Sequence, residues 1–126
     1  MTFSTVINCM DGRIQTPVLD YMRERYGHPF VDNITIAGPV RILTEGKAKA
    51  VVAAVLERLG VSVKLHGSRT IAVVAHHDCA GNPVDRETQI AQLVPSMEWV
   101  RAHYPRCEVI GLWVNEDWVV EEVVPD

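Results

Sequence analysis

The sequence predicts an α/β fold, in which helices cover both faces of an open, mostly parallel sheet. The predicted strand order is 2-1-3-4, with an antiparallel edge strand at the C-terminus. Apolar runs rich in β-branched residues alternate with stretches of helical periodicity in the order β-α-β-α-β-α-β-β. Ile71–Ala75 is apolar throughout, as expected of a parallel strand that is covered on both faces. The sequence contains no repeat and no linker, so we expect one domain over residues 1–126.

The first part of the chain is expected to hold two strands separated by a helix. Phe3–Cys9 is the first strand. Thr16 can cap a helix that has Pro17 at its first position, and Gly27 is the stop signal for this helix. Val31–Ile36 is then the second strand.

The middle of the chain contains the strongest helical signal. Thr44 is predicted to cap a helix that runs to Gly60. Val61–Arg69 is compatible with a short strand or with a connecting loop, and the pattern does not distinguish between them. The third strand, Ile71–Ala75, follows, and polar residues begin directly after it at His76.

The last part of the chain is expected to form a helix followed by two strands. Asp85 is the predicted N-cap, and Pro95 is expected to break or kink the helix before it ends near His103. Cys107–Val114 is a further apolar strand. Trp118–Val124 is expected to return antiparallel at the edge of the sheet.

Composition excludes several classes of function. The net charge of −4 is mild and the charges form no run, so neither a nucleic-acid surface nor a membrane patch is expected. No apolar stretch reaches the ~20 residues of a membrane-spanning helix. The N-terminus lacks the features of a signal peptide, so a cytoplasmic location is expected. Three cysteines argue against a disulfide framework there and leave metal binding, catalysis or plain burial.

Three potential metal ligands are predicted to meet at one edge of the sheet. Cys9 ends the first strand, and His76 and Cys79 follow the third. In the predicted strand order these strands are neighbours, and their carboxyl ends form the crevice where open α/β sheets bind ligands. Two thiolates and an imidazole suit Zn²⁺, and three protein ligands leave a fourth position open. The alternative is two buried cysteines and a core histidine, which is less favoured because Asp11 and Arg13 lie beside Cys9.

Two motifs resemble those of the β-class carbonic anhydrases. Cys9-Met10-Asp11-Gly12-Arg13 matches their C-x-D-x-R motif, and His76-His77-Asp78-Cys79 matches H-x-x-C. The similarity extends over most of the chain, because further features follow in the order typical of the family: the Asn33–Gly38 strand end, Leu59-Gly60 and the Trp113–Val120 hairpin.

This resemblance implies a zinc-dependent lyase that reversibly hydrates carbon dioxide to bicarbonate by means of zinc-bound hydroxide. Cys9, His76 and Cys79 would bind Zn²⁺. Asp11 and Arg13 would be the catalytic pair, in which Asp11 either binds zinc as a fourth ligand or accepts a hydrogen bond from the hydroxide while Arg13 holds it. The alternatives are hydrolysis of carbonyl sulfide or carbon disulfide and a non-catalytic zinc-binding homologue. The resemblance also implies a homodimer or a higher homo-oligomer.

The sequence departs from the family pattern around the expected substrate pocket. Cys9 comes earlier than is usual, without the N-terminal helices of the family, and Ala80 replaces the usual glycine, with Gly81 one position later. The pocket wall must therefore come from other apolar residues or from a partner subunit. The candidates are Ile14, Val18, Ile36, Pro39 and Val40. His77 is expected to face solvent rather than shuttle protons, and Cys107 to pack in its strand.

Overall fold

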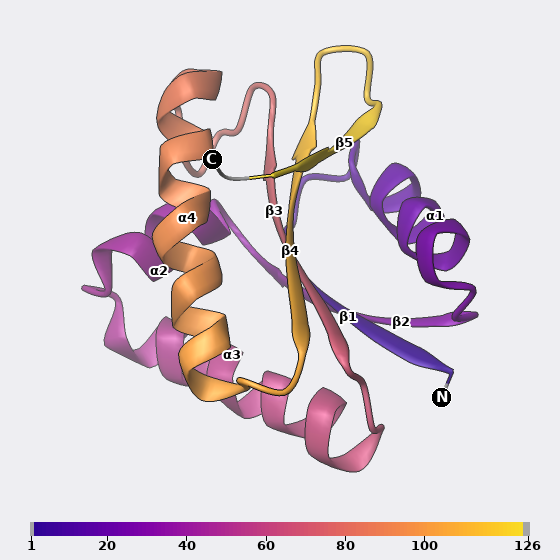
Figure 1. Cartoon of the computed structure of the whole chain (residues 1–126). Coiled ribbons are helices and arrows are strands. Elements are labelled where there is room, and N and C mark those ends of the chain that lie inside the picture. The colour runs from indigo at the N-terminus through magenta and orange to yellow at the C-terminus, as the bar shows by residue number, and fades with distance from the viewer. Residues whose placement is uncertain (1, 125–126) are drawn as a thin grey trace.

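The computed structural model describes residues 2–124 and shows a five-stranded sheet of order β2-β1-β3-β4-β5 (Figure 1). The first four strands pair in parallel, and the fifth pairs antiparallel with β4 at the edge. The predicted fold class and strand order are therefore confirmed. The strands are β1 (Phe3–Cys9), β2 (Phe30–Ile36), β3 (Thr70–His76), β4 (Glu108–Val114) and β5 (Val120–Val123).

Helices cover both faces of this sheet (Figure 1). Helix α1 (Gln15–Tyr26) lies on one face, while α2 (Pro39–Glu45), α3 (Lys49–Gly60) and α4 (Arg86–His103) lie on the other. A π-helical turn, η1 (Val61–Leu65), continues α3. Among residues 2–124, no helix combines the length and the apolarity needed to cross a bilayer.

The alternation of side chains along β1, β3 and β4 divides the core into two layers. Val6 and Val74 point toward α1, where they pack with Met22. Ile7 and Val73 point to the opposite face and pack with residues of α3 and α4 that include Leu59, Leu93 and Met97. Each of these large apolar side chains contributes about 1.5–3 kcal/mol to folding by leaving water. The packing fixes the strand register, and with it the position of the residues that end β1 and β3.

Helix α1 begins earlier than the sequence pattern predicts. Ile14 occupies the N-cap position without a side-chain cap, so Thr16 is not the cap and Pro17 is the third helical residue. The reason lies in Gln15, whose Nε2 donates to the carbonyl of Cys9 at 2.8 Å and to that of Asp11 at 2.7 Å and so draws the helix start toward β1. The predicted stop at Gly27 is confirmed, with φ 68°.

The predicted cap at Thr44 is wrong, because this residue lies inside the short helix α2. Its hydroxyl donates instead to the carbonyl of Gln92 in α4, at 2.9 Å. Helix α3 begins at Lys49, after Ala48, and has no side-chain cap. A helix of seven residues is too short to show a clear periodicity, although Pro39 at its first position is a usual start signal.

Residues 61–69 start with a π-helical turn, rather than forming a strand or only a loop. Ser62 is buried in this turn, and its hydroxyl donates to Asp32 Oδ2 at 2.6 Å and contacts Thr5 Oγ1 at 2.6 Å. His66 Nδ1 lies 2.7 Å from the same carboxylate oxygen. These contacts hold the wider turn against the amino ends of β1 and β2.

Helix α4 has the predicted cap and end, but it is not broken at Pro95. The backbone N–H of Thr88 donates to Asp85 Oδ1 at 2.9 Å, as expected of an N-cap. The helix continues through Pro95 to His103 because its buried stripe, which includes Leu93, keeps it seated on the sheet. The last strand begins at Val120 instead of Trp118, which adopts a left-handed backbone conformation (φ 60°) in the preceding turn.

Candidate metal centre

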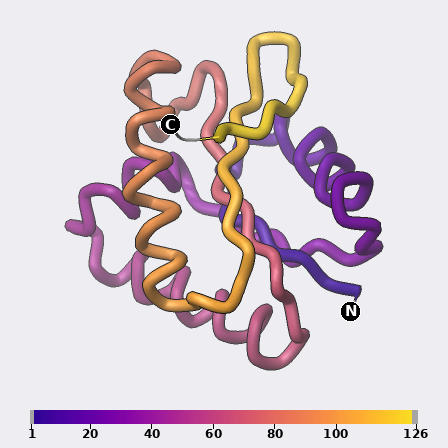
Figure 2. Tube along the Cα trace, viewed as in Figure 1, coloured from indigo at the N-terminus to yellow at the C-terminus, as the bar shows by residue number. Residues whose placement is uncertain are grey.

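The structure brings Cys9, His76 and Cys79 together at the carboxyl ends of β1 and β3. Their ligand atoms all lie within 4.8 Å of one another, and the two sulfur atoms are 3.8 Å apart. All three residues are buried, with exposed fractions of 1–4%. Figure 2 shows that the chain leaves β1 and β3 toward the same edge of the sheet, near the β4–β5 hairpin. Residues from two distant parts of the sequence therefore form one cluster.

A close backbone contact holds the loop after β3 over this cluster. A Cβ atom added at Gly81 would lie 2.8 Å from the backbone of Ala37 and Gly38. A Cβ atom at Gly38 would lie 2.6 Å from the carbonyl oxygen of Gly81, and Gly38 has a left-handed backbone with φ 60°. Glycine is therefore required at both positions, and together they place Cys79 opposite Cys9.

The donor set fits a zinc ion. His76 Nδ1 lies 2.8 Å from the carbonyl oxygen of His77, which can only accept, so Nδ1 carries the proton and Nε2 keeps its lone pair. His76 Nε2 is buried and has no hydrogen-bond partner within residues 2–124. An imidazole oriented in this way beside two thiols is the borderline-soft set that binds Zn²⁺.

The two thiols influence each other's ionisation. The pKa of Cys9 lies far below its usual value, first because the Cys79 thiol donates to its sulfur and also because His76 is close. The pKa of Cys79 is raised by that same interaction and by burial. Burial alone would lower the pKa of His76, but the nearby Cys9 sulfur and the carbonyl of His77 outweigh it, and the net shift is upward. The cluster thus favours a first thiolate strongly and a second only with a compensating cation.

Asp11 lies beside the cluster and is held by Arg13. Arg13 donates from Nε to Asp11 Oδ1 at 3.0 Å and from Nη2 to Oδ2 at 2.7 Å, and its backbone N–H donates to Oδ1 at 2.9 Å. These hydrogen bonds lower the pKa of Asp11 to about 2. Asp11 Oδ2 is 4.0 Å from His76 Nε2, so the carboxylate faces the cluster while it is bound to arginine.

Two glutamines that the sequence pattern does not single out support the site. Gln89 is buried in α4. Its Nε2 donates to the backbone carbonyl of His76 at 2.9 Å, and its Oε1 accepts from the backbone N–H of His76 at 3.3 Å. Gln15 binds the carbonyls that flank Met10 from the start of α1. The available signal was the position of Gln89 on the same helical stripe as Leu93, where a core residue is expected.

The family model described as "Putative carbonic anhydrase" matches residues 1–124. The chain belongs to this carbonic anhydrase family. No curated protein matches the chain. The family match covers the whole cluster, together with Asp11 and Arg13.

Solved carbonic anhydrases share the fold. The carbonic anhydrase of Streptococcus mutans aligns with a TM-score of 0.63 and 18% identity, over 95% of this chain and 81% of that chain. The carbonic anhydrase of Glaciozyma antarctica aligns with a TM-score of 0.58 and 19% sequence identity, over 95% of this chain and 81% of that chain. A structure from work on two tetrameric β-carbonic anhydrases of Sordaria macrospora aligns with a TM-score of 0.56 and 11% sequence identity. This alignment covers 99% of this chain and 82% of that chain.

A cavity of about 510 Å³ adjoins the cluster on the side of β4. The wall of this cavity includes Cys79, the rest of the 77–80 loop, Gln89 and Trp113. Two charged residues, Arg86 and Glu116, also line it. None of the five residues expected to form the pocket wall lines this cavity. Ile14 and Val18, for example, lie at the start of α1 and are fully buried between this helix and the sheet.

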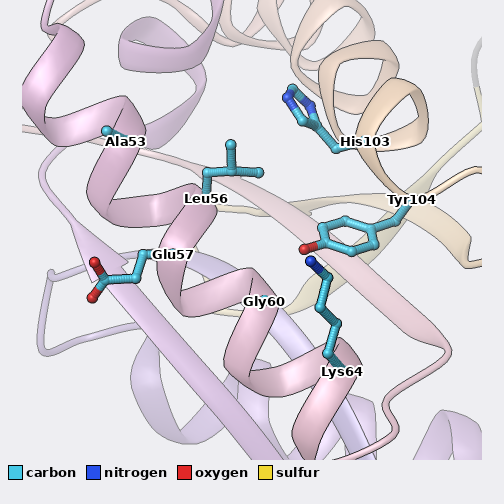
Figure 3. Close-up of a pocket in the computed structure, with 7 residues that line it drawn as sticks. All are labelled: Ala53, Leu56, Glu57, Gly60, Lys64, His103 and Tyr104. Atoms are coloured by element: carbon cyan, nitrogen blue, oxygen red, sulfur yellow. The ribbon is translucent and has the colours of Figure 1, made fainter.

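The remaining candidate side chains lie outside the cluster. His77 is exposed, and its ring lies 6.3 Å from that of Trp118. Cys107 is half-buried, and its thiol donates to the carbonyl of Ser68 at 3.8 Å, near the amino end of β3. A second cavity, of about 550 Å³, opens between the ends of α3 and α4, where Lys64 and Tyr104 face each other (Figure 3). This cavity lies at the opposite end of the sheet from the cluster.

Proposed function

We propose that the chain is a zinc-dependent carbonic anhydrase that catalyses the reversible hydration of carbon dioxide to bicarbonate. The observation that carries this proposal is the buried group of two thiols and one imidazole, with the lone pair of His76 Nε2 free, at the crevice of a carbonic anhydrase fold. Cys9, His76 and Cys79 would hold the ion. Zinc in this position would lower the pKa of a water bound to it and supply a hydroxide nucleophile near neutral pH.

Asp11 has the properties of a hydrogen-bond acceptor for the attacking water. Its pKa of about 2 keeps the carboxylate ionised at neutral pH, so it accepts a hydrogen bond and does not store a proton. An acceptor fixed in one direction orients the oxygen lone pair toward the carbon atom of the substrate. The same carboxylate would have to leave Arg13 to act as a fourth metal ligand, because Arg13 now binds both of its oxygens.

Arg13 acts through Asp11 by holding both carboxylate oxygens. A planar guanidinium that binds a carboxylate with two parallel hydrogen bonds fixes its position and its plane. The cavity beside Cys79 offers room for a small substrate, and the largely apolar indole of Trp113 suits an uncharged molecule such as carbon dioxide. Because His77 faces solvent, we assign it no part in proton transfer. The simplest route for the released proton is direct transfer to buffer.

We also propose that the chain forms a homo-oligomer. Phe30 at the β2 edge is 55% exposed, and Val119 and Val124 beside β5 are 54% and 77% exposed. Apolar side chains at both edges of a sheet favour association of subunits. The solved relatives from Sordaria macrospora are described as tetrameric.

The proposed activity is tested by stopped-flow measurement of carbon dioxide hydration with zinc-loaded protein, in parallel with its zinc content. Turnover by wild type that is lost with removal of the metal supports the proposal. Zinc-loaded, folded protein without turnover above the buffer rate contradicts it, and carbonyl sulfide and carbon disulfide are then the next substrates to assay.

A further inference from the structure

Arg13 is held by two residues besides Asp11. Its Nη1 donates to Asp78 Oδ2 at 3.1 Å, and its Nη2 donates to the carbonyl of Asp78 at 3.0 Å. Its guanidinium carbon lies 4.6 Å from the centre of the Trp118 ring. With the two bonds to Asp11, four of the five N–H donors of the guanidinium are used, and its cationic carbon lies over the indole ring.

Both of these additional residues have an unusual backbone. Within residues 2–124, Asp78 (φ 57°) and Trp118 (φ 60°) are the non-glycine residues with positive φ. A left-handed conformation is uncommon for non-glycine residues. Aspartate adopts it more readily than most, whereas a bulky side chain such as tryptophan needs support from its surroundings to keep it. These two residues are 40 positions apart in the sequence (Asp78 and Trp118), in different loops, yet both contact the same guanidinium.

We propose that Asp78 and Trp118 are positioning residues that fix the Arg13 guanidinium and, through it, the orientation of the Asp11 carboxylate. This inference rests on the proposed function, because it assigns the purpose of the arrangement to catalysis. Arg13 has a side chain that is 45% exposed, so its bonds to Asp11 alone would let the pair move together. Contacts from the loop after β3 and from the β4–β5 turn tie the pair to the sheet on two further sides.

The arrangement is tested by the exchange of the Arg13 Nε–H with water, measured by ¹⁵N NMR on the zinc-loaded full chain. This proton donates to Asp11 Oδ1 and therefore reports on the pair directly. Asp78→Gly removes the carboxylate while glycine tolerates the left-handed backbone, and Asp78→Ala removes the carboxylate alone. We expect exchange to accelerate about tenfold in both variants, as local opening becomes easier.

The glycine variant separates positioning from a purely structural role. If Asp78 only shapes its turn, Asp78→Gly will exchange like wild type, because glycine adopts this backbone without strain. Asp20→Asn is the matched control, since it breaks an exposed ion pair with Arg23 at 3.3 Å and should leave Arg13 unchanged.

Trp118 is tested in the same way with a conservative rescue. Trp118→Leu keeps an apolar side chain but loses the ring, so exchange at Arg13 should accelerate, while Trp118→Phe should restore most of the protection. Unchanged exchange in folded Asp78→Gly and Trp118→Leu protein overturns the proposal.

Kinetics provide a second, independent test of the assignment to catalysis. Asp78→Ala should lower kcat about tenfold or more with little change in KM, because it disturbs an interaction used by the attacking water. In an Arg13→Ala background the same change should have no further effect. An equal effect in both backgrounds contradicts action through Arg13. If wild type has no hydration activity, the proposed function fails while the exchange measurement still decides whether Asp78 and Trp118 hold Arg13.

Discussion

The Sγ atoms of Cys9 and Cys79 lie 3.8 Å apart, although 70 positions separate the two residues in the sequence. They meet because β1 and β3 are adjacent parallel strands that end at the same edge of the sheet. Two buried thiolates at this distance repel each other strongly unless a cation lies between them. The pair, with His76 Nε2 beside it, could therefore hold a cation that would stabilise a second thiolate.

The first prediction concerns metal content. Purified protein should contain about one zinc per chain, because the three potential ligands lie close enough together to bind a single ion. Cys9→Ser, His76→Ala and Cys79→Ser should each lose most of this zinc, as measured by elemental analysis. Cys107→Ser is the matched control, since this free cysteine lies outside the cluster and should retain full zinc. Full retention by Cys79→Ser would remove Cys79 from the ligand set.

The second prediction concerns the close contact that positions Cys79. Gly81→Ala should destabilise the protein by about 1–3 kcal/mol, because the added Cβ atom meets the backbone of Ala37 and Gly38 at 2.8 Å. It should also weaken zinc binding, since the loop must move. Gly12→Ala is the control, because a Cβ atom added at Gly12 would meet no other atom within 4 Å. If urea unfolding gives the same free energy of unfolding for Gly81→Ala and Gly12→Ala, the loop accommodates the added Cβ atom without loss of stability.

The third prediction concerns stability in acid. The pKa of Asp11 is lowered from 3.8 to about 2 in the folded protein, chiefly by its hydrogen bonds with Arg13. A depressed carboxyl pKa stabilises the fold above the unfolded pKa, and this contribution disappears as pH falls from about 4 to about 2. Because Arg13 is 45% exposed, screening reduces the expected contribution to about 1 kcal/mol.

Denaturant unfolding of wild type and Asp11→Asn as a function of pH checks this linkage. Asp11→Asn should be less stable near pH 7, and the difference should narrow below pH 4. Asp117→Asn is the control, since its carboxylate makes no ion pair within residues 2–124. A difference between wild type and Asp11→Asn that stays constant down to pH 2 would show that the Asp11–Arg13 pair does not contribute to folding through its charge.

The fourth prediction concerns assembly. Light scattering at micromolar concentration should give at least twice the 14.1 kDa mass of one chain, because apolar side chains are exposed at both sheet edges. Substitution of Val119 by lysine should weaken an association that uses the β5 edge. A monomer mass for wild type at this concentration would contradict the homo-oligomer.

The fold and the cluster of Cys9, His76 and Cys79 were predictable because both follow from strand periodicity. Each apolar run showed where a strand ends, and the alternation of elements placed the first and third strands side by side, so the meeting of Cys9 with His76 and Cys79 could be inferred. Helix α2 was missed because seven residues give too little periodicity, and η1 because its hydrogen bonds to Asp32 are tertiary.

The surroundings of Arg13 could not be inferred from periodicity. Asp78 and Trp118 contact it from two turns in which each adopts a left-handed backbone, and no hydrophobic pattern reports this conformation. The burial of Ile14 and Val18 could not be inferred from the sequence either, since both satisfy the same apolar pattern whether they line a pocket or fill a core. In both cases the decisive information is the tertiary path of a loop.

Stopped-flow hydration of carbon dioxide at pH 8.5 is the most direct test of the central claim, that the cluster and the Asp11–Arg13 pair form a working carbonic anhydrase site. Zinc-loaded wild type should show turnover that increases with pH, as the attacking water loses its proton more readily. Asp11→Ala should reduce this turnover by about a hundredfold while zinc remains bound, because the acceptor for that water is gone. Wild type with one zinc per chain and no hydration above the buffer rate would contradict the claim.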